Sequence, residues 1–263
     1  MELHLKGKSA FIAGASRGLG YAVARGLLLE GCRVVINGRN NINLDSAAAR
    51  LINETGGMVV PLSGDVTDPD VPALLMRSTV DALGSLDLLV TNSGGPPPGQ
   101  FENVADADWY KAIDSSLMSH VRLIRAALPH LQDSEIPSVL TITSISVKQP
   151  IPNLILSNSI RAATVGLTKT LALEIGHTGI RFNSILPGWT TTERVTELLT
   201  NRAAQNGTTV EFEIARQSSE SPLGRLATPE EFANAAVFLL SPAASYITGV
   251  MLTVDGGMYK GTL

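Results

Sequence analysis

Ser157 and Arg161 lie four residues apart in the segment LILSNSIRAATVGLTKTLALEIG, which spans residues 154–176. Apolar residues recur there at helical spacing, so both side chains fall on one face of the expected helix, about one turn apart. A hydroxyl and a guanidinium can both donate hydrogen bonds to a developing oxyanion. Neither replaces a good proton donor, because a guanidinium keeps its proton in proteins. The pair is either an unusual catalytic centre or a place where catalysis has been lost.

A glycine-rich turn, AGASRGLG at residues 13–20, could hold a phosphate group. Gly14, Gly18 and Gly20 stand between an expected strand and an expected helix, in a unit of about 30 residues that is typical of dinucleotide binding. Glycines allow a sharp turn and a close approach of the pyrophosphate, and the helix N-terminus offers free N–H groups. The spacing differs from the common Gly-x-Gly-x-x-Gly motif, so a glycine turn needed only for packing is the alternative.

Two arginines indicate which dinucleotide would bind. In NAD-binding proteins the second strand usually ends in an acid that accepts a hydrogen bond from the ribose 2′-OH. Here the segment VVINGRNN has no acid at that place, and Arg39 stands there instead, with Arg17 inside the glycine turn. Two guanidiniums can bracket a 2′-phosphate. The pattern favours NADP(H) over NAD(H), the alternative being two solvated arginines.

Two further loops follow expected strands. Asp65 stands just past the third strand, where its carboxylate could accept a hydrogen bond from the adenine amine. Asn92 and the two glycines at 94 and 95 follow the fourth strand and permit close approach of a cofactor. The prolines at 96–98 then stiffen the chain. We interpret this stretch as a rigid rim of the substrate pocket, or else as a stiff surface loop.

Alternating apolar segments predict the elements that must position these residues. We expect strands at 9–15, 32–38, 86–92, 138–146, 179–188 and 250–257, and another that begins near residue 58. We expect helices at 18–31, 44–57, 68–84, 106–131, 154–176 and 227–242. The alternation predicts an α/β fold, a Rossmann-type doubly wound parallel sheet of about seven strands with helices on both faces, in a single domain at 1–263.

Residues 190–220 interrupt the alternation with a polar segment just after a strand's carboxyl end, where such sheets bind ligands. We interpret the segment as a mobile helical lid over a substrate pocket, the alternative being a surface helical insertion. The next helix has a start signal, with Thr228 as the cap, Pro229 at the first helical position and Glu231 completing a capping box.

The composition limits the kinds of molecule that the chain is expected to bind. The formal net charge of the 263-residue chain is −4, so we expect no nucleic-acid partner. Cys32 is the only cysteine, and the four histidines are scattered, so neither a disulfide nor a metal site is expected. No apolar run approaches the ~20 residues of a membrane span. No signal peptide is evident, and we expect a cytoplasmic protein that acts on a small molecule.

These motifs resemble the short-chain dehydrogenase/reductase family. The matches are the Gly14-Gly18-Gly20 turn, Asp65-Val66, Asn92-Ser93-Gly94, Ser144, Pro187-Gly188 and the tail YITGVMLTVDGG, and they cover almost the whole chain in order. The tail and the segment SPLGRLATPEEFANAAVFLLSP are similar to the 3-oxoacyl-[acyl-carrier-protein] reductase branch. The resemblance implies cofactor contacts from Gly14, Ser16, Arg17, Gly18, Leu19, Gly20, Asn37, Arg39, Asp65, Val66, Asn92, Ser93, Gly94, Arg161, Pro187, Gly188 and Thr190.

The resemblance also places the family's Asn-Ser-Tyr-Lys tetrad, of which this sequence keeps one member. Ser144 takes the serine position, Ser157 the tyrosine position, Arg161 the lysine position and Ser116 the asparagine position. The family tyrosine acts as general acid, with a phenol pKa of about 10 that the lysine lowers. The serines could still hydrogen-bond a developing alkoxide. Arg161 could stabilise it and bind the nicotinamide ribose.

Other residues could take part in the chemistry. Lys148 is the strongest alternative proton source, because it stands four residues after Ser144. His120 lies one helical turn from Ser116, where a packed or surface histidine is the simpler interpretation. Trp189 could cover the nicotinamide or serve packing. Three tyrosines stand in segments that we interpret as structural: Tyr110, Tyr246 and Tyr259.

Three functions remain open from the sequence. The protein is an NADP(H)-dependent oxidoreductase with an altered proton donor, a cofactor-binding relative without turnover, or a structural subunit that binds nothing in particular. The glycine turn with its two arginines speaks against the third. Family resemblance further implies a homotetramer or homodimer, built through the expected helices at about 106–130 and 154–177, where Ala162, Ala163 and Gly166 are small enough for close helix contact.

Overall fold

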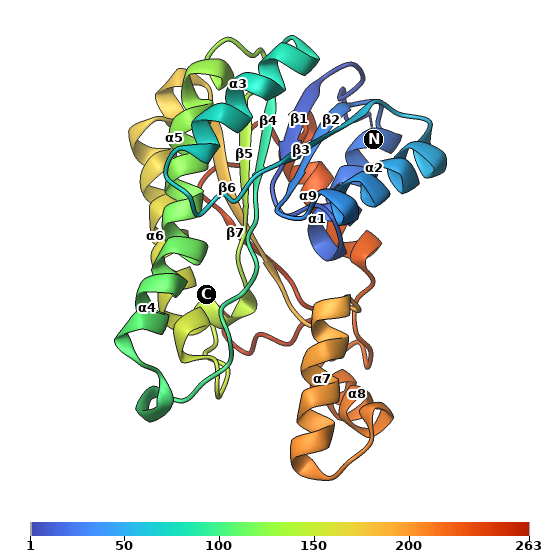
Figure 1. Cartoon of the computed structure of the whole chain (residues 1–263), viewed down its shortest axis with the longest axis vertical. Helices are drawn as coiled ribbons and strands as arrows, with labels where there is room; N and C mark the ends of the chain where they lie inside the picture. The colour runs from blue at the N-terminus through green and yellow to red at the C-terminus, as the bar shows by residue number, and fades with distance from the viewer. Residues whose placement is uncertain (1, 263) are drawn as a thin grey trace.

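A computed structural model describes residues 2–262 and contains one seven-stranded sheet, in which every neighbouring pair of strands is parallel. The strand order is β3-β2-β1-β4-β5-β6-β7 (Figure 1). The predicted Rossmann-type fold class is thereby confirmed. The predicted domain also includes residues 1 and 263, which lie outside the described residues. The strands are β1 (Ser9–Ile12), β2 (Arg33–Gly38), β3 (Val59–Ser63), β4 (Leu88–Thr91), β5 (Ser138–Ile142), β6 (Arg181–Pro187) and β7 (Met251–Val254).

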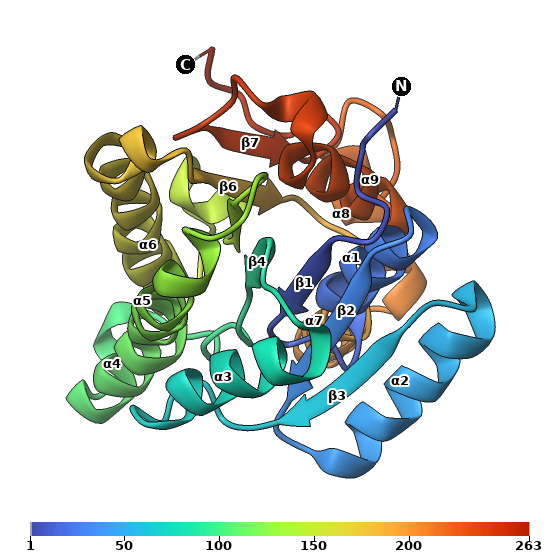
Figure 2. The same ribbon diagram turned by 90° about the horizontal axis from the view of Figure 1, so that it is seen from above.

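Helices cover both faces of the sheet (Figure 2). One face carries α1 (Gly18–Leu29), α2 (Asn41–Thr55) and α9 (Pro229–Leu240). The other face carries α3 (Val71–Leu83), α5 (Ser119–Leu131) and α6 (Ile155–Glu174), and α4 (Asp106–Ile113) packs against α6. Such a two-sided arrangement buries the parallel strands on both faces, which explains why their sequences are almost continuously apolar.

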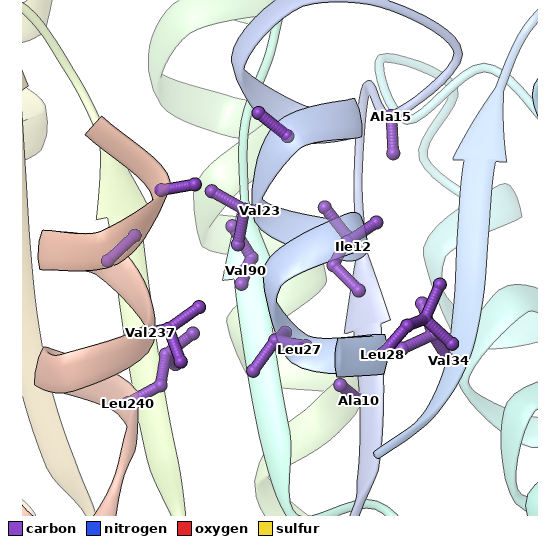
Figure 3. Packing of buried hydrophobic residues seen from close by; sticks show 14 of the residues in the cluster. Ala10, Ile12, Ala15, Val23, Leu27, Leu28, Val34, Val90, Val237 and Leu240 are labelled. Carbon is purple, nitrogen blue, oxygen red and sulfur yellow. The ribbon is translucent and has the colours of Figure 1, made fainter. Parts of the chain in front are cut away.

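The larger core cluster lies between the sheet and the pair α1 and α9. Figure 3 shows Val23 and Leu27 of α1 between the strands β1, β2 and β4 and the α9 residues Val237 and Leu240. These side chains are almost wholly buried. Each Å² of apolar area that is removed from water stabilises the folded chain by about 25 cal/mol. The core therefore fixes the N-terminus of α1 against the carboxyl end of β1, where the glycine turn lies.

The predicted single helix at 106–131 is wrong in its middle. A π-helical turn, η2 (Asp114–Met118), separates α4 from α5. The wider π turn disturbs the regular ladder of backbone bonds, and side chains satisfy the backbone there. Ser119 donates to the carbonyl of Ser115 at 2.6 Å, and Thr164 of α6 donates to the carbonyl of Ser116. Apolar periodicity could not show this turn, because the flanking helical turns continue the same pattern.

Several predicted elements end earlier or begin earlier than expected. The strand predicted at 9–15 ends at Ile12. The strand predicted at 138–146 ends at Ile142, because Ser144 accepts a hydrogen bond from the backbone N of Ser146 and caps the short helix η3 (Ile145–Val147). The last strand covers 251–254 rather than 250–257. Helix α2 begins at Asn41 rather than at 44, because the Asn40 side chain caps it.

The predicted insertion at 190–220 forms two helices, α7 (Glu193–Asn206) and α8 (Val210–Ser219), which extend from the body below the carboxyl ends of the strands (Figure 1). Thr192 and Thr209 cap the two helices. Arg202 of α7 bonds Gln217 of α8 at 3.0 Å, which joins the two helices into one hairpin. Helix α9 follows the insertion, and its predicted capping box is confirmed. The short helix η5 (Pro242–Ala244) follows α9.

The described part of the chain holds no helix with the length and apolarity that a membrane crossing requires. Within the same residues, no three or more His, Cys, Asp or Glu side chains are grouped so that they could hold a metal ion. Cys32 is buried, and desolvation raises the pKa of its thiol to about 12. The thiol is therefore protonated at neutral pH and behaves as a small apolar core side chain.

Candidate functional site

The candidate site lies where the strand order reverses, between β1 and β4. In open parallel sheets this switch point leaves a crevice outside the carboxyl ends of the strands, where ligands bind. The glycine turn follows β1 and Asn92 follows β4. The Asn92 amide donates to the carbonyls of Ala13 and Gly14, at 3.3 and 3.1 Å, so it ties the two loops together.

The glycine turn is tightly constrained. Gly14 and Gly18 have φ values of +59° and +61°, in the left-handed region that favours glycine. Gly20 is required for a different reason, because a Cβ there would lie 2.4 Å from the carbonyl oxygen of Gly14. Packing alone therefore explains Gly20, while Gly14 also faces a cavity. Arg17 between them is extended and precedes α1 without capping it, so its side chain is available for other contacts.

A cavity of about 560 Å³ opens beside this turn, large enough for a small-molecule ligand. Its wall is formed by the end of β2, by the loops after β1, β2, β3 and β4, and by the end of α4 and the start of η2. It gathers ten residues that the sequence pattern assigned to a cofactor: Gly14, Ser16, Arg17, Asn37, Arg39, Asp65, Val66, Asn92, Ser93 and Gly94.

Arg17 and Arg39 of this wall are exposed and held in loose ion pairs. Arg17 lies 3.3 Å from Glu197 of α7, and Arg39 lies 3.9 Å from Asp65. Exposed pairs of this kind contribute little to stability, so a bound anion can replace the carboxylates. No acid stands at the end of β2. Asn37 is there, buried, and its amide donates to the carbonyls of Leu62 and Gly64, which joins β2 to the loop after β3.

The second part of the site is a group of hydroxyls at the end of β5. Ser144 accepts from the backbone N of Ser146, and the Ser146 hydroxyl lies 3.4 Å from the Ser157 hydroxyl. Ser146 and Ser157 are buried. The structure thus brings Ser157 of α6 against Ser146, which stands two residues after Ser144 in the chain. Ser146 was not among the predicted residues, and its small size gave no signal in the sequence.

Arg161 is the cation of this second part. It is 6% exposed, and its Nη1 donates to the carbonyls of Ile142 and Thr143 at 3.3 and 3.2 Å. Burial, and to a lesser degree the guanidinium of Arg194, lowers the pKa of Arg161 to about 10. The side chain is still a cation at neutral pH. It can stabilise negative charge and cannot act as a proton donor in turnover.

Ser116 of η2 and His120 of α5 are buried close to α6. Ser116 is fully buried in η2, its carbonyl accepts from Thr164, and its hydroxyl is 3.5 Å from that of Ser115. His120 is buried, and neither ring nitrogen has a hydrogen-bond partner among the described residues. Burial, together with the charge of Arg161, lowers the pKa of His120 to about 3. The imidazole is therefore neutral at neutral pH.

The other candidates for proton transfer are engaged or exposed. The Lys148 ammonium lies 5.3 Å from the centre of the Tyr259 ring, a cation–π contact. Tyr110 and Tyr246 are exposed, and neither belongs to the cluster of serine hydroxyls at the end of β5. Trp189 lies under the guanidinium of Arg202 of α7 at 5.3 Å. The indole thus anchors the insertion, in agreement with the packing interpretation of this residue.

The remaining predicted cofactor residues lie around the end of β6. Pro187 is the last residue of β6, and a Cβ on Gly188 would lie 2.7 Å from Cα of Asp255, so the glycine permits close packing of the C-terminal segment. Thr190 is buried, and its hydroxyl has no partner among the described residues. Leu19 is half-buried and packs against the α1 core, so any contact with a cofactor would be through its backbone.

The two parts of the site meet at one residue. The cavity lining does not include Ser144, Ser157 or Arg161. Gly95 does line the cavity, and a Cβ there would lie 3.7 Å from Nη2 of Arg161. The loop after β4 therefore separates the cavity beside the glycine turn from the hydroxyl–guanidinium part, and it is the wall that both share.

Comparisons with known proteins place this geometry in a family. Residues 14–259 match the family described as enoyl-(acyl carrier protein) reductase. The chain belongs to the short-chain dehydrogenase/reductase family. The 7alpha-hydroxysteroid dehydrogenase of Escherichia coli (strain K12) is 32% identical over 258 residues, which are 97% of this chain and 96% of that protein. The sequence-based prediction of an oxidoreductase is confirmed at the level of this family.

Solved structures support the same assignment. L-sorbose reductase from Gluconobacter frateurii, in complex with NADPH and L-sorbose, superposes with a TM-score of 0.95 at 32% identity and covers 99% of this chain and 100% of that chain. A variant of actinorhodin polyketide ketoreductase with NADPH superposes with a TM-score of 0.91 at 28% identity, covering 97% and 98%.

Sequence reasoning missed three contacts within this family fold. Thr164 bonds the carbonyl that η2 leaves free, Glu197 pairs with Arg17, and Arg194 donates to the carbonyl of Pro96 at 3.4 Å. Each joins segments far apart in the chain. The charges in 190–220 gave a signal that the insertion is polar, but periodicity could not show which element each charge faces.

Proposed function

We propose that the protein is an NADP(H)-dependent oxidoreductase that acts on a carbonyl or hydroxyl group of a small molecule. Its cofactor site is the set of seventeen residues predicted from the sequence, with Arg17 and Arg39 around the 2′-phosphate. The observation that carries the proposal is the cavity beside the glycine turn, lined by both arginines and by no acid at the end of β2. Two structurally similar proteins were crystallised with NADPH, which agrees with this choice over NAD(H).

The reacting centre in this proposal consists of Ser144, Ser157, Ser116 and Arg161. The serine hydroxyls donate hydrogen bonds to the oxygen of the substrate carbonyl, and Arg161 stabilises the charge that develops on it. Arg161 would also bind the ribose hydroxyls of the nicotinamide. When bound, NADPH supplies the hydride, and positioning it against the carbonyl can contribute roughly 7–11 kcal/mol.

The missing phenol restricts the substrate. A carbonyl whose reduced form tolerates negative charge, such as a quinone or a diketone, suits this centre, whereas a simple ketone needs a proton in the transition state. We therefore expect NADPH oxidation with a quinone and only slow oxidation with an acetoacetyl thioester. Rapid turnover of the thioester would contradict this and would support the 3-oxoacyl-[acyl-carrier-protein] reductase activity that the sequence resemblance suggested.

A second candidate is a relative that binds NADP(H) without turnover and acts as a regulatory subunit. The observation in its favour is that the cluster of hydroxyls at the end of β5 is formed by serines and contains no tyrosine. Ser157, at the position of the family tyrosine, contacts Ser146 there. Titration of NADPH fluorescence followed by a screen of carbonyl compounds separates the two. Tight binding without oxidation of any compound would select the regulatory subunit.

A homotetramer or homodimer stays part of the proposal, as do a cytoplasmic location and the lack of a nucleic-acid partner. Ala162, Ala163 and Gly166 are exposed on α6, so they do not pack against the sheet and are free for contact between helices. The insertion at 190–220 would serve as the substrate lid. Size-exclusion chromatography with light scattering tests the oligomeric state directly, and a monomer would contradict it.

A further inference from the structure

We infer that the substrate carries a negative group, a carboxylate, which binds between Arg161 of α6 and Arg194 of the insertion. The inference rests on the proposed function and names the class of substrate that the same site accepts. Four observations carry it: the lack of a counter-ion for either arginine, the common wall on which both lie, the weak bond that now holds Arg194, and the direction of the acids on α7.

Neither arginine has a carboxylate partner among the described residues. All ion pairs found there involve other cations. Arg161 is almost wholly buried, and its acceptors are two neutral backbone carbonyls. A buried charge without an opposite charge is costly, so a site that keeps one gains from binding an anion.

Both guanidiniums end on the same short loop. Nη2 of Arg161 lies beside Gly95, and Nη2 of Arg194 donates to the carbonyl of Pro96. Consecutive Cα atoms are about 3.8 Å apart, so the two cations approach one point of the wall from α6 and from the insertion. The two charges are close enough for Arg194 to contribute to the lowered pKa of Arg161. The two like charges repel, and an anion between them would offset this repulsion by attracting both.

The bond that now holds Arg194 is weak. At 3.4 Å it is longer than the 2.7–3.2 Å of ordinary N–H···O bonds, and its acceptor is a neutral carbonyl. A carboxylate accepts two parallel bonds from a guanidinium at shorter distance and with about twice the strength. A carboxylate at this place would therefore displace the carbonyl of Pro96.

The acids on α7 do not compete for this cation. Glu197 pairs with Arg17, and Glu193 points to the glycine turn, since a Cβ on Gly18 would lie 3.8 Å from its carboxylate. The first turns of α7 thus direct their acids to the cofactor side and Arg194 to the substrate side. This division leaves Arg194 free to select the charge of the substrate.

The test compares acids with their neutral esters. Pyruvate, acetoacetate and levulinate, and the methyl ester of each, are titrated calorimetrically into the protein with and without saturating NADP⁺. Native protein is compared with Arg194→Ala, Arg194→Lys and the matched control Arg77→Ala, which removes an exposed arginine of α3 that does not line the cavity. NADPH titration of each variant, which the inference does not require to change, checks the proposed function separately.

We expect at least one acid to bind ten-fold or more tightly than its ester, with the preference lost in Arg194→Ala, partly kept in Arg194→Lys and unchanged in Arg77→Ala. Equal binding of every acid and its ester, or a preference that persists in Arg194→Ala, would overturn the inference while leaving an NADPH-binding enzyme intact. If no variant binds NADPH, the proposed function fails, and the titrations without cofactor still decide the inference by the same criterion.

Discussion

The proposed cofactor side and the proposed catalytic side of this site are built by different means. The cofactor side depends on backbone geometry, since Gly14 and Gly18 adopt left-handed conformations and Gly20 packs against the carbonyl of Gly14. The catalytic side depends on side chains that reach from α6 to the end of β5, where Arg161 bonds two carbonyls. A backbone cradle tolerates few substitutions, whereas a side-chain cluster can exchange its chemistry and keep the fold.

The largest effect is expected on the catalytic side, from Arg161→Met. The variant keeps much of the side-chain volume and removes the charge, so the fold should persist. Loss of one preorganised oxyanion donor typically lowers kcat about 10²–10³-fold. Steady-state NADPH oxidation with a quinone measures this, and Arg161→Lys, which keeps a cation, should retain more activity. If Arg161→Met turned over like the native protein, the guanidinium would have no role in the chemistry.

On the cofactor side, Gly20→Ala tests whether the turn is fixed by packing. The new methyl group would meet the carbonyl of Gly14, and such overpacking costs typically 1–3 kcal/mol of the free energy of unfolding. Urea denaturation gives the change, and weaker NADPH binding should accompany it. Gly176→Ala is the control, because a Cβ there meets nothing within 4 Å. Equal stability of the two variants would show that the turn can move.

Arg39→Ala tests the charge of the cofactor side separately from its backbone. Removing one partner of a charged hydrogen bond costs about 1.5–3 kcal/mol, so NADPH should bind about ten-fold or more weakly while NADH binds as before. Fluorescence titration with both dinucleotides measures the ratio. The same loss for NADH would mean that Arg39 does not distinguish a 2′-phosphate.

The smallest effect is expected where the insertion contacts the cofactor side. In Glu197→Gln the exposed pair with Arg17 is lost, and Arg17 becomes free for a phosphate. Pairs of this kind contribute about 0–1 kcal/mol, so NADPH affinity should rise only about two- to three-fold at low salt. Glu211→Gln on α8 is the control. A fall in NADPH affinity would indicate that the pair positions Arg17 rather than competes for it.

The fold could be predicted from the sequence because its signals are local. Alternating apolar segments gave the strands and helices, and the capping box at Thr228 gave the start of α9. The π turn at 114–118 could not be predicted, because the bond from Thr164 that satisfies it comes from 48 residues further along the chain. Element ends were missed where one side chain decides them, as Asn40 does for α2.

The candidate site could be predicted in part. The ten predicted residues that line the cavity follow strands whose carboxyl ends must meet at one edge of a parallel sheet. The contacts of Arg194 and Ser146 could not be predicted, because a side chain's direction depends on the placement of α7 and η3 rather than on spacing. The contacts of Asn37 could not be predicted for the same reason. Its amide donates to the carbonyls of Leu62 and Gly64, so part of its hydrogen-bonding capacity is already used within the protein.

The most direct test of the central claim is pre-steady-state NADPH oxidation by the native protein and by the S157Y/R161K variant, with cyclohexanone and with a quinone. The account predicts that the native protein reduces cyclohexanone slowly and that the variant, if its circular dichroism shows that it is folded, reduces it at least about 10²-fold faster. Quinone reduction should change little. Native reduction of cyclohexanone as fast as that of the variant would contradict the account, because a competent proton donor would then already be present.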